Sequence, residues 1–195
     1  MQYDNRRPVM HIYNYFQILF GLSEAGLFIF KRSKTVAQKS NTDKRSLLFL
    51  WITIPAVLTF SGFITHYKIG PTLDSIVLQD IGLTVIVIGF IIRWIAVVQL
   101  GRLFTVDVAI SATHTLKTEG LYKIVRHPSY LGLMLIITGL AVCMPSLVWM
   151  AVTIIAVFIA MNYRIIVEEE ALTNEFGDQY RDYSEKVSKL IPWLY

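Results

Sequence analysis

Five long apolar blocks alternate with polar, charge-rich connections along the chain. The blocks cover residues of about 13–30, 47–64, 81–100, 130–144 and 146–163. A helix needs about 20 apolar residues to cross the hydrocarbon core of a bilayer, with a range of about 17 to 25. The first three blocks meet this length, the fifth meets it narrowly, and the fourth is short. The pattern predicts an all-α, polytopic membrane protein with about five transmembrane helices.

The last two blocks are separated by almost no loop. Only Met144, Pro145 and Ser146 lie at the junction, and a proline there interrupts a continuous helix. We therefore expect these two spans to form a tight helical hairpin.

The tail after the last block has apolar and aromatic residues at helical spacing, which is typical of an amphipathic helical segment. These residues are Phe176, Tyr180, Tyr183, Val187 and Leu190. We expect this C-terminal segment to pack on the mouth of the hairpin or to lie in the membrane interface.

The composition agrees with a membrane protein and excludes several other classes. Of the 195 residues, 54% are hydrophobic and 16% are charged, so residues 1–195 are predicted to form one membrane-embedded domain. The single cysteine, Cys143, leaves no disulfide framework and no cysteine-built zinc site. No glycine-rich nucleotide loop occurs, which excludes a soluble dinucleotide-binding fold. The histidines lack a metal-ligand spacing, so we expect no metal. They are His11, His66, His114 and His127.

Basic residues gather on one side of the predicted spans. The connections on that side and the tail hold Lys31, Arg32, Lys34, Lys39, Lys44, Arg45, Arg102, Lys117, Lys123, Arg126, Arg164, Arg181, Lys186 and Lys189. The opposite side holds only Arg6, Arg7 and Lys68. The positive-inside rule then places segments 101–129 and 164–195 together at the cytoplasmic face, where a site is to be assembled. This topology explains the net charge of +4 without a nucleic-acid partner.

Polar, chemically capable residues crowd at the start of the fourth block. Arg126, His127, Ser129 and Tyr130 lie within five positions around Pro128. A residue before proline favours extended geometry, and proline suits the first turn of a helix. We therefore expect His127 at the mouth of a helix whose free N–H groups favour an anionic ligand group. The alternative is a histidine that only caps the helix or packs.

A second polar cluster follows the fifth block. Arg164 and Glu168 are four residues apart, so on a continuous helix they share one face, while Glu169 and Glu170 are expected to point elsewhere. The alternative is a charged turn where the helix leaves the membrane. Glu24 and Arg93 lie within predicted spans, where charges are costly, and are therefore candidates for function. The sequence leaves open whether they pair or whether Arg93 reaches the interface by snorkelling.

Several motifs in the second half of the chain resemble one known family. They are Leu100–Thr105, His114–Lys117, Gly120–Tyr122, Arg126–Tyr130, Glu168–Glu169 and Glu175–Tyr180. In this order they resemble the isoprenylcysteine carboxyl methyltransferase family, within a wider group that includes membrane phospholipid methyltransferases. The resemblance covers roughly residues 80–195, and the first two spans match only in character. It implies a multi-pass membrane enzyme that uses S-adenosylmethionine and faces the cytoplasm.

The resemblance also implies roles for individual residues. Contacts to the methyl donor would come from His114, Thr115, Leu116, Lys117, Tyr122, His127, Pro128, Ser129, Tyr130 and Glu168. Arg164 would face the methyl acceptor, which makes Arg164 and Glu168 the candidate catalytic residues. Lys117 stands where the family usually has an apolar residue, so only its backbone is expected to make a contact. Asp107 matches a further polar position of the family only with altered spacing.

The chemistry of these residues agrees with the implied roles. Glu168 can hold the donor's ammonium or favour its positive charge, and His127 with nearby helix N–H groups can meet its carboxylate. Leu116, Tyr122 and Tyr130 can enclose adenine. Arg164 suits a bidentate contact to an acceptor carboxylate. We expect a monomer whose lipophilic acceptor enters sideways from the bilayer.

Three activities remain open at this point. The first is O-methylation of a carboxylate on an isoprenylcysteine or another small lipophilic acid. The second is N-methylation of a phospholipid such as phosphatidylethanolamine, which requires a general base because an amine must lose a proton. The third is an NADPH-dependent reduction, because membrane sterol reductases share an arginine–histidine–proline–x–tyrosine motif and a proline–aromatic C-terminus.

Overall fold

Helices form almost the whole of the described chain in the computed structural model. The structure describes residues 7–30, 41–67, 70–73, 75–101, 115–144 and 146–192. The helices are α1 (Arg7–Phe30), α2 (Asn41–His66), α3 (Ile76–Leu100), the 3₁₀ turn η1 (Gly120–Lys123), α4 (Pro128–Val142), α5 (Leu147–Phe176) and α6 (Asp178–Lys186). Among the described residues, strand-type pairing is limited to two isolated bridges. The prediction of an all-α fold is confirmed.

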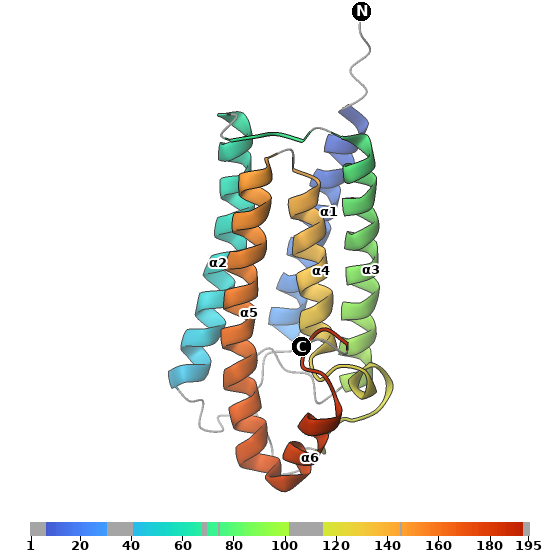
Figure 1. The fold of residues 1–195 in the computed structure, drawn as a ribbon, viewed down its shortest axis with the longest axis vertical. Helices are drawn as coiled ribbons and strands as arrows, with labels where there is room; N and C mark the ends of the chain where they lie inside the picture. Colours follow the sequence, from blue (N-terminus) through green and yellow to red (C-terminus); the bar gives the residue numbers. More distant parts are fainter. Residues whose placement is uncertain are drawn as a thin grey trace, which may run out of the picture.

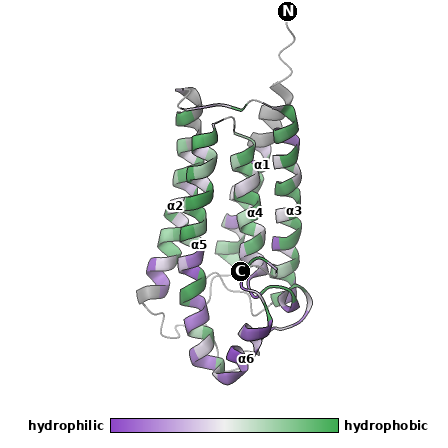
Figure 2. Cartoon of the chain, in the orientation of Figure 1, coloured by the Kyte–Doolittle hydropathy of each residue, from purple (hydrophilic) through white to green (hydrophobic). Residues whose placement is uncertain are grey.

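The five long helices run along the long axis of the molecule, and α6 lies beyond the end of the bundle (Figure 1). Apolar residues dominate along the bundle, and hydrophilic residues gather at the end where α6 lies (Figure 2). By length and composition, α3 and α5 are able to cross a membrane, whereas Tyr15–Phe30 and α4 are apolar but shorter. The count of about five membrane-crossing helices therefore stays a prediction.

The predicted hairpin of the last two long helices is present. Helix α4 ends at Val142, α5 begins at Leu147, and the two helices pack against each other. Ser146 is buried and its hydroxyl accepts a hydrogen bond from the Trp149 N–H, which caps the start of α5. This short connection makes α4 and α5 neighbours at the end of the molecule away from α6.

The tail agrees with the predicted pattern in one respect and differs from it in another. Helix α5 continues past residue 163, where the apolar block ends, to Phe176, so Arg164 and Glu168 lie on one continuous helix as expected. The predicted amphipathic segment is not a single helix. Gly177 has a φ of +54°, which favours glycine, and separates α5 from α6. Helix α6 then ends at Lys186, and Val187 is extended.

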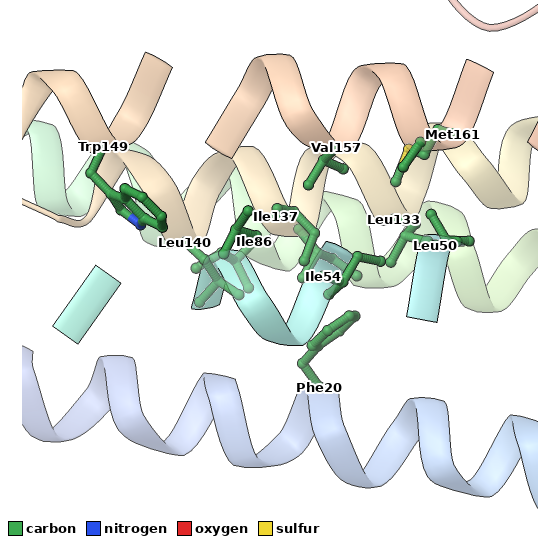
Figure 3. Packing of buried hydrophobic residues seen from close by; sticks show 13 residues of the cluster. Phe20, Leu50, Ile54, Ile86, Leu133, Ile137, Leu140, Trp149, Val157 and Met161 are labelled. Atoms are coloured by element: carbon green, nitrogen blue, oxygen red, sulfur yellow. The ribbon is translucent and has the colours of Figure 1, made fainter. Parts of the chain in front are cut away.

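The apolar core lies between the long helices. Figure 3 shows Phe20 of α1 pointing toward Ile54, with Leu133 and Ile137 further from α1. The remaining buried residues of this cluster are Leu50, Val57, Ile86, Ile136, Leu140, Trp149, Val157, Ala160 and Met161. Large apolar side chains are also exposed on the outer faces of the helices, as a surrounding bilayer requires.

Helices α3 and α4 approach each other closely through four glycines. A Cβ atom on Gly132 would lie 2.6 Å from the backbone nitrogen of Arg93, and one on Gly139 would lie 2.6 Å from the carbonyl oxygen of Gly82. Gly89 meets the backbone of α4 in the same way. Small residues at such contacts allow tight helix packing in membranes. The contact places Arg93 directly beside the first turns of α4.

We expect Gly132→Ala to lower the free energy of unfolding by about 1–3 kcal/mol, because the added methyl group must push two backbones apart. Gly26→Ala is the matched control, since a Cβ there meets nothing within 4 Å. Thermal unfolding of both variants in detergent measures the effect. Equal midpoints for the two variants would show that the glycine contact does not hold α3 against α4.

Candidate active site

One cavity joins the apolar bundle to its polar end. It has a volume of about 610 Å³, which lies within the range of small-molecule sites, roughly 300–1,000 Å³. One part of its wall is apolar and comes from α1, α2 and α4. The other part is polar and comes from the segment before η1, from η1 itself and from α4, α5 and α6. The cavity therefore has both an apolar and a polar wall.

The structure brings most of the predicted site residues to this cavity. The lining residues include Thr115, Leu116, Lys117, Tyr122, His127, Ser129, Tyr130, Arg164 and Glu168. Pro128 is the first residue of α4 and does not line the cavity among the described residues. His114 and Asp107 lie outside the described residues. The roles assigned to all these residues stay predictions, but their common location agrees with one shared site.

The motif at the start of α4 folds as its sequence predicts. His127 precedes the helix with a φ of −124°, and Pro128 occupies the first turn. The imidazole is buried, and its Nε2 lies 3.1 Å from the Glu169 carboxylate. The backbone N–H of His127 donates to the carbonyl of Lys189. His127 is therefore paired with an acid and with the tail, and its role toward an anionic group of the donor stays a prediction.

Glu169 points away from the face that Arg164 and Glu168 share, as predicted, and it does not line the cavity among the described residues. Its carboxylate accepts a hydrogen bond of 2.9 Å from Arg126 Nε and lies 3.5 Å from Lys189 Nζ, in addition to its contact with His127. Glu168 and Glu169 leave α5 in different directions, and the mouth of α4 and the tail both approach the Glu169 side. The sequence of α5 alone does not predict these neighbours of Glu169. Glu170 is exposed, as expected.

Arg126 fastens the tail to the mouth of α4. Its Nη1 donates to the carbonyls of Ser184 and Val187, and its backbone N–H donates to Ser188 at 2.8 Å. These bonds satisfy carbonyls at the end of α6 that lack helical partners. The predicted packing of the C-terminal segment on the hairpin mouth is confirmed, and α6 becomes one wall of the cavity.

Aromatic side chains form the wall near η1 and α6. The Tyr183 hydroxyl donates to the Tyr122 carbonyl, and the Tyr122 hydroxyl donates to the Ala96 carbonyl at 3.3 Å. Burial raises the pKa of the Tyr183 phenol to about 12, and burial also raises the pKa of Tyr122 above its ordinary value. Both phenols therefore keep their protons at neutral pH and remain donors. With Tyr180 and Phe176 they give the polar end an aromatic lining.

A chain of polar side chains crosses the cavity wall from α4 to α2. The Tyr130 hydroxyl donates to Glu168 at 2.8 Å and accepts from Arg164 Nε at 3.3 Å. On its other side, Arg164 donates from Nη1 to the Asp43 carboxylate and to the Ser46 hydroxyl. Arg164 is only 1% exposed. The predicted pair of Arg164 and Glu168 is thus bridged by Tyr130.

Sequence reasoning missed Asp43 and Ser46. Both precede the apolar block predicted to start at residue 47, so they were grouped with the polar connection. The structure instead includes them in the first turn and a half of α2, with 3% and 0% exposure. Their spacing of three residues places them on one helix face. This three-residue spacing is the only feature of the sequence that indicates a shared position for Asp43 and Ser46.

Glu24 and Arg93 form an ion pair that links α1 to α3. Arg93 Nη2 and Nε lie 2.6 and 2.7 Å from the two carboxylate oxygens of Glu24. Arg93 Nη1 donates to the carbonyl and the hydroxyl of Ser129 at 3.0 and 3.1 Å. The arginine therefore pairs and does not snorkel. It also holds the first turn of α4, where the predicted donor contacts lie.

Comparisons with known proteins show which families and relatives this chain is similar to. The model of the isoprenylcysteine carboxyl methyltransferase (ICMT) family matches residues 81–174. Protein-S-isoprenylcysteine O-methyltransferase A of Arabidopsis thaliana is 31% identical over 181 residues, covering 91% of this chain and 89% of the relative. Methanethiol S-methyltransferase 1 of Bradyrhizobium diazoefficiens is 45% identical over 78 residues, 40% of this chain and 26% of that protein.

A solved structure matches the fold over nearly the whole chain. It is that of the eukaryotic intramembrane Ras methyltransferase ICMT, with a TM-score of 0.67 and 26% identity, covering 95% of this chain and 67% of that chain. The fold and the cavity thus define an integral membrane enzyme. The chain belongs to the isoprenylcysteine carboxyl methyltransferase family and is a methyltransferase.

We expect Glu24→Gln to lower the free energy of unfolding by about 3–5 kcal/mol, because it leaves the buried Arg93 charge without its counter-charge. The matched control is Glu170→Gln, since Glu170 is exposed on α5. Replacing both partners with apolar residues, Glu24→Leu with Arg93→Met, should recover most of the loss. A Glu24→Gln protein with the parent's unfolding midpoint in detergent would contradict this account.

Proposed function

We propose that the protein transfers a methyl group from S-adenosylmethionine to the carboxylate of an isoprenylcysteine or of another small lipophilic acid. The observation that carries the proposal is a cavity with a polar, aromatic end and an apolar end, with Arg164 and Glu168 lining it. The similarity to protein-S-isoprenylcysteine O-methyltransferases supports the same class of acceptor.

The apolar end suits a lipid chain. Leu47, Leu50, Ile54 and Leu58 line it from one face of α2, and Phe20 lines it from α1. Residues 47 and 58 are about 17 Å apart along a helix at 1.5 Å per residue. An extended hydrocarbon chain fits along such a wall and gains free energy by leaving water. The acceptor would enter from the bilayer between the helices, with its polar head toward Arg164.

The polar end fits the charged groups of the proposed donor. One Glu168 oxygen accepts from Tyr130, and the other oxygen accepts no hydrogen bond from the described residues. That oxygen can accept from the donor's ammonium. The first-turn N–H groups of α4, at Ser129 and Tyr130, can donate to its carboxylate. Tyr122 and Tyr183 supply flat apolar surface for adenine.

When bound, S-adenosylmethionine supplies an electrophilic methyl group, and its transfer to a carboxylate leaves a neutral thioether and a neutral ester. A carboxylate acceptor loses no proton, so the protein needs no general base for this step. Arg164 holds the acceptor's carboxylate by its charge and planar donor set. Burial of the site keeps water away and fixes the reacting groups, and such positioning supplies much of the rate.

The charge pattern supports a site that faces the cytoplasm. The polar end of the cavity is built from segments 115–130 and 164–183, which lie on the side rich in Lys and Arg. The proposed donor would then arrive from the cytosol and the acceptor from the bilayer.

A thiol acceptor is the second candidate. The short but close similarity to methanethiol S-methyltransferase 1 favours it. A thiol must lose its proton, and Glu168 or His127 is the available base. Phospholipid N-methylation makes the same demand on a base. Family membership leaves no support for the NADPH-dependent reduction.

Radiolabelled S-adenosylmethionine tests the proposal with the protein in nanodiscs. The acceptors offered in parallel are N-acetyl-S-farnesylcysteine, phosphatidylethanolamine and methanethiol. We expect label in a base-labile methyl ester of the prenylcysteine. Label only in phospholipid or in dimethyl sulfide would replace the carboxylate with another acceptor, and no labelled product from any of them would overturn the proposal.

We expect Glu168→Gln to weaken binding of S-adenosylhomocysteine at least tenfold, because a charged hydrogen bond to the ammonium contributes about 1.5–3 kcal/mol. The control is Glu170→Gln, two residues further along α5 and exposed. Calorimetric titration in detergent measures both affinities. An unchanged dissociation constant for Glu168→Gln would remove Glu168 from the donor site.

We expect Arg164→Lys to lower kcat at least tenfold while leaving the affinity for S-adenosylhomocysteine within twofold. Lysine keeps the charge but loses the planar fork that orients a carboxylate. Initial rates with the methyl acceptor and titration of S-adenosylhomocysteine separate the two effects. Loss of donor affinity with kcat retained would assign Arg164 to the donor instead.

A further inference from the structure

We infer that Asp43 is a positioning residue for methyl transfer, acting through Arg164 and without touching either substrate. This inference rests on the proposed role of Arg164 at the acceptor. Asp43 lies in the first turn of α2, outside the region matched by the family model. It does not line the cavity among the described residues, whereas Arg164 does.

Three acceptors meet one nitrogen of Arg164. The Nη1 group donates to the Asp43 carboxylate, to the Asp43 carbonyl at 3.2 Å and to the Ser46 hydroxyl at 2.9 Å. The Ser46 hydroxyl in turn donates to the same Asp43 carbonyl at 2.9 Å. The first turn of α2 therefore forms a rigid cluster of acceptors around one end of the guanidinium.

The same guanidinium is also held on the side of α4. Its Nε group donates to the Tyr130 hydroxyl at 3.3 Å, and that hydroxyl donates to Glu168. Arg164 is thus held from α2 on one side and from α4 on the other, although it belongs to α5. A long, flexible side chain fixed at both edges presents one defined orientation to an incoming carboxylate.

The charge of Asp43 is as relevant as its geometry. A buried guanidinium needs a counter-charge, and among the described residues the carboxylates of Asp43 and Glu168 both act on Arg164. Glu168 lies on the cavity side and Asp43 on the α2 side. Because Asp43 pairs with Arg164 directly, Arg164 does not need to turn onto Glu168, and Glu168 stays available to the donor. Asp43 thereby keeps the two candidate catalytic residues in separate roles.

Asp43→Asn tests this inference, because it keeps the shape and one acceptor but removes the charge. With N-acetyl-S-farnesylcysteine as the acceptor, we expect kcat to fall about 10- to 100-fold, since a displacement of about 1 Å can reduce the rate that much. The affinity for S-adenosylhomocysteine should stay within threefold, which also shows that the variant is folded. Asp182→Asn, on the exposed face of α6, is the matched control.

A double-substitution cycle separates positioning from simple loss of structure. In an Arg164→Lys background, Asp43→Asn should reduce kcat by less than threefold, because the lysine has no Nη1 group to hold. A structural defect would reduce the rate equally in both backgrounds. If Asp43→Asn fails to fold, Ser46→Ala takes its place, with an expected smaller fall in kcat.

The outcomes distinguish the two claims. If the unsubstituted protein does not methylate the prenylcysteine, the proposed acceptor and this inference both fail. If it does so and Asp43→Asn, or Ser46→Ala in its place, has the same kcat, the inference alone is overturned. Equal losses in the parent and Arg164→Lys backgrounds would also overturn it.

Discussion

Two arginines are buried in the apolar bundle, and each is neutralised by a carboxylate from another helix. Arg93 of α3 pairs with Glu24 of α1, and Arg164 of α5 pairs with Asp43 of α2. An unpaired charge in such surroundings costs several kcal/mol, so these pairs constrain which helices lie side by side. Both arginines also contact the first turn of α4, through Ser129 and Tyr130. The polar groups that tie the bundle together therefore also build the cavity wall.

The close contact of α3 and α4 positions one wall of the site. Because glycines let these helices touch backbone to backbone, Arg93 reaches Ser129 and the mouth of α4 is held in place. The tail then covers this mouth, where Arg126 binds the Val187 carbonyl and Glu169 pairs with both Arg126 and Lys189. The result is a polar pocket closed by α6 and continuous with an apolar groove between α1, α2 and α4. That continuity is what a reaction between a water-soluble donor and a lipid requires.

The sequence predicted what local pattern determines and missed what depends on distant partners. Apolar runs indicated the helices, and the Pro128 context indicated the start of α4. Gly177 was the unrecognised break in the tail, because apolar spacing continued across it. Asp43 could not be foreseen as a partner of Arg164, since the two residues are 121 positions apart. The partners of Glu169 could not be foreseen for the same reason, because they come from the residues just before α4 and from the tail, and not from its own helix.

The account depends on Glu168 and Arg164 serving one donor and one acceptor in the same cavity. A structure of the protein with S-adenosylhomocysteine and a prenylcysteine analogue tests this most directly. The account predicts the donor's amino group at Glu168, its adenine against Tyr122 and Tyr183, and the acceptor's carboxylate at Arg164. Density for either molecule outside this cavity, or an acceptor carboxylate bound away from Arg164, would contradict it.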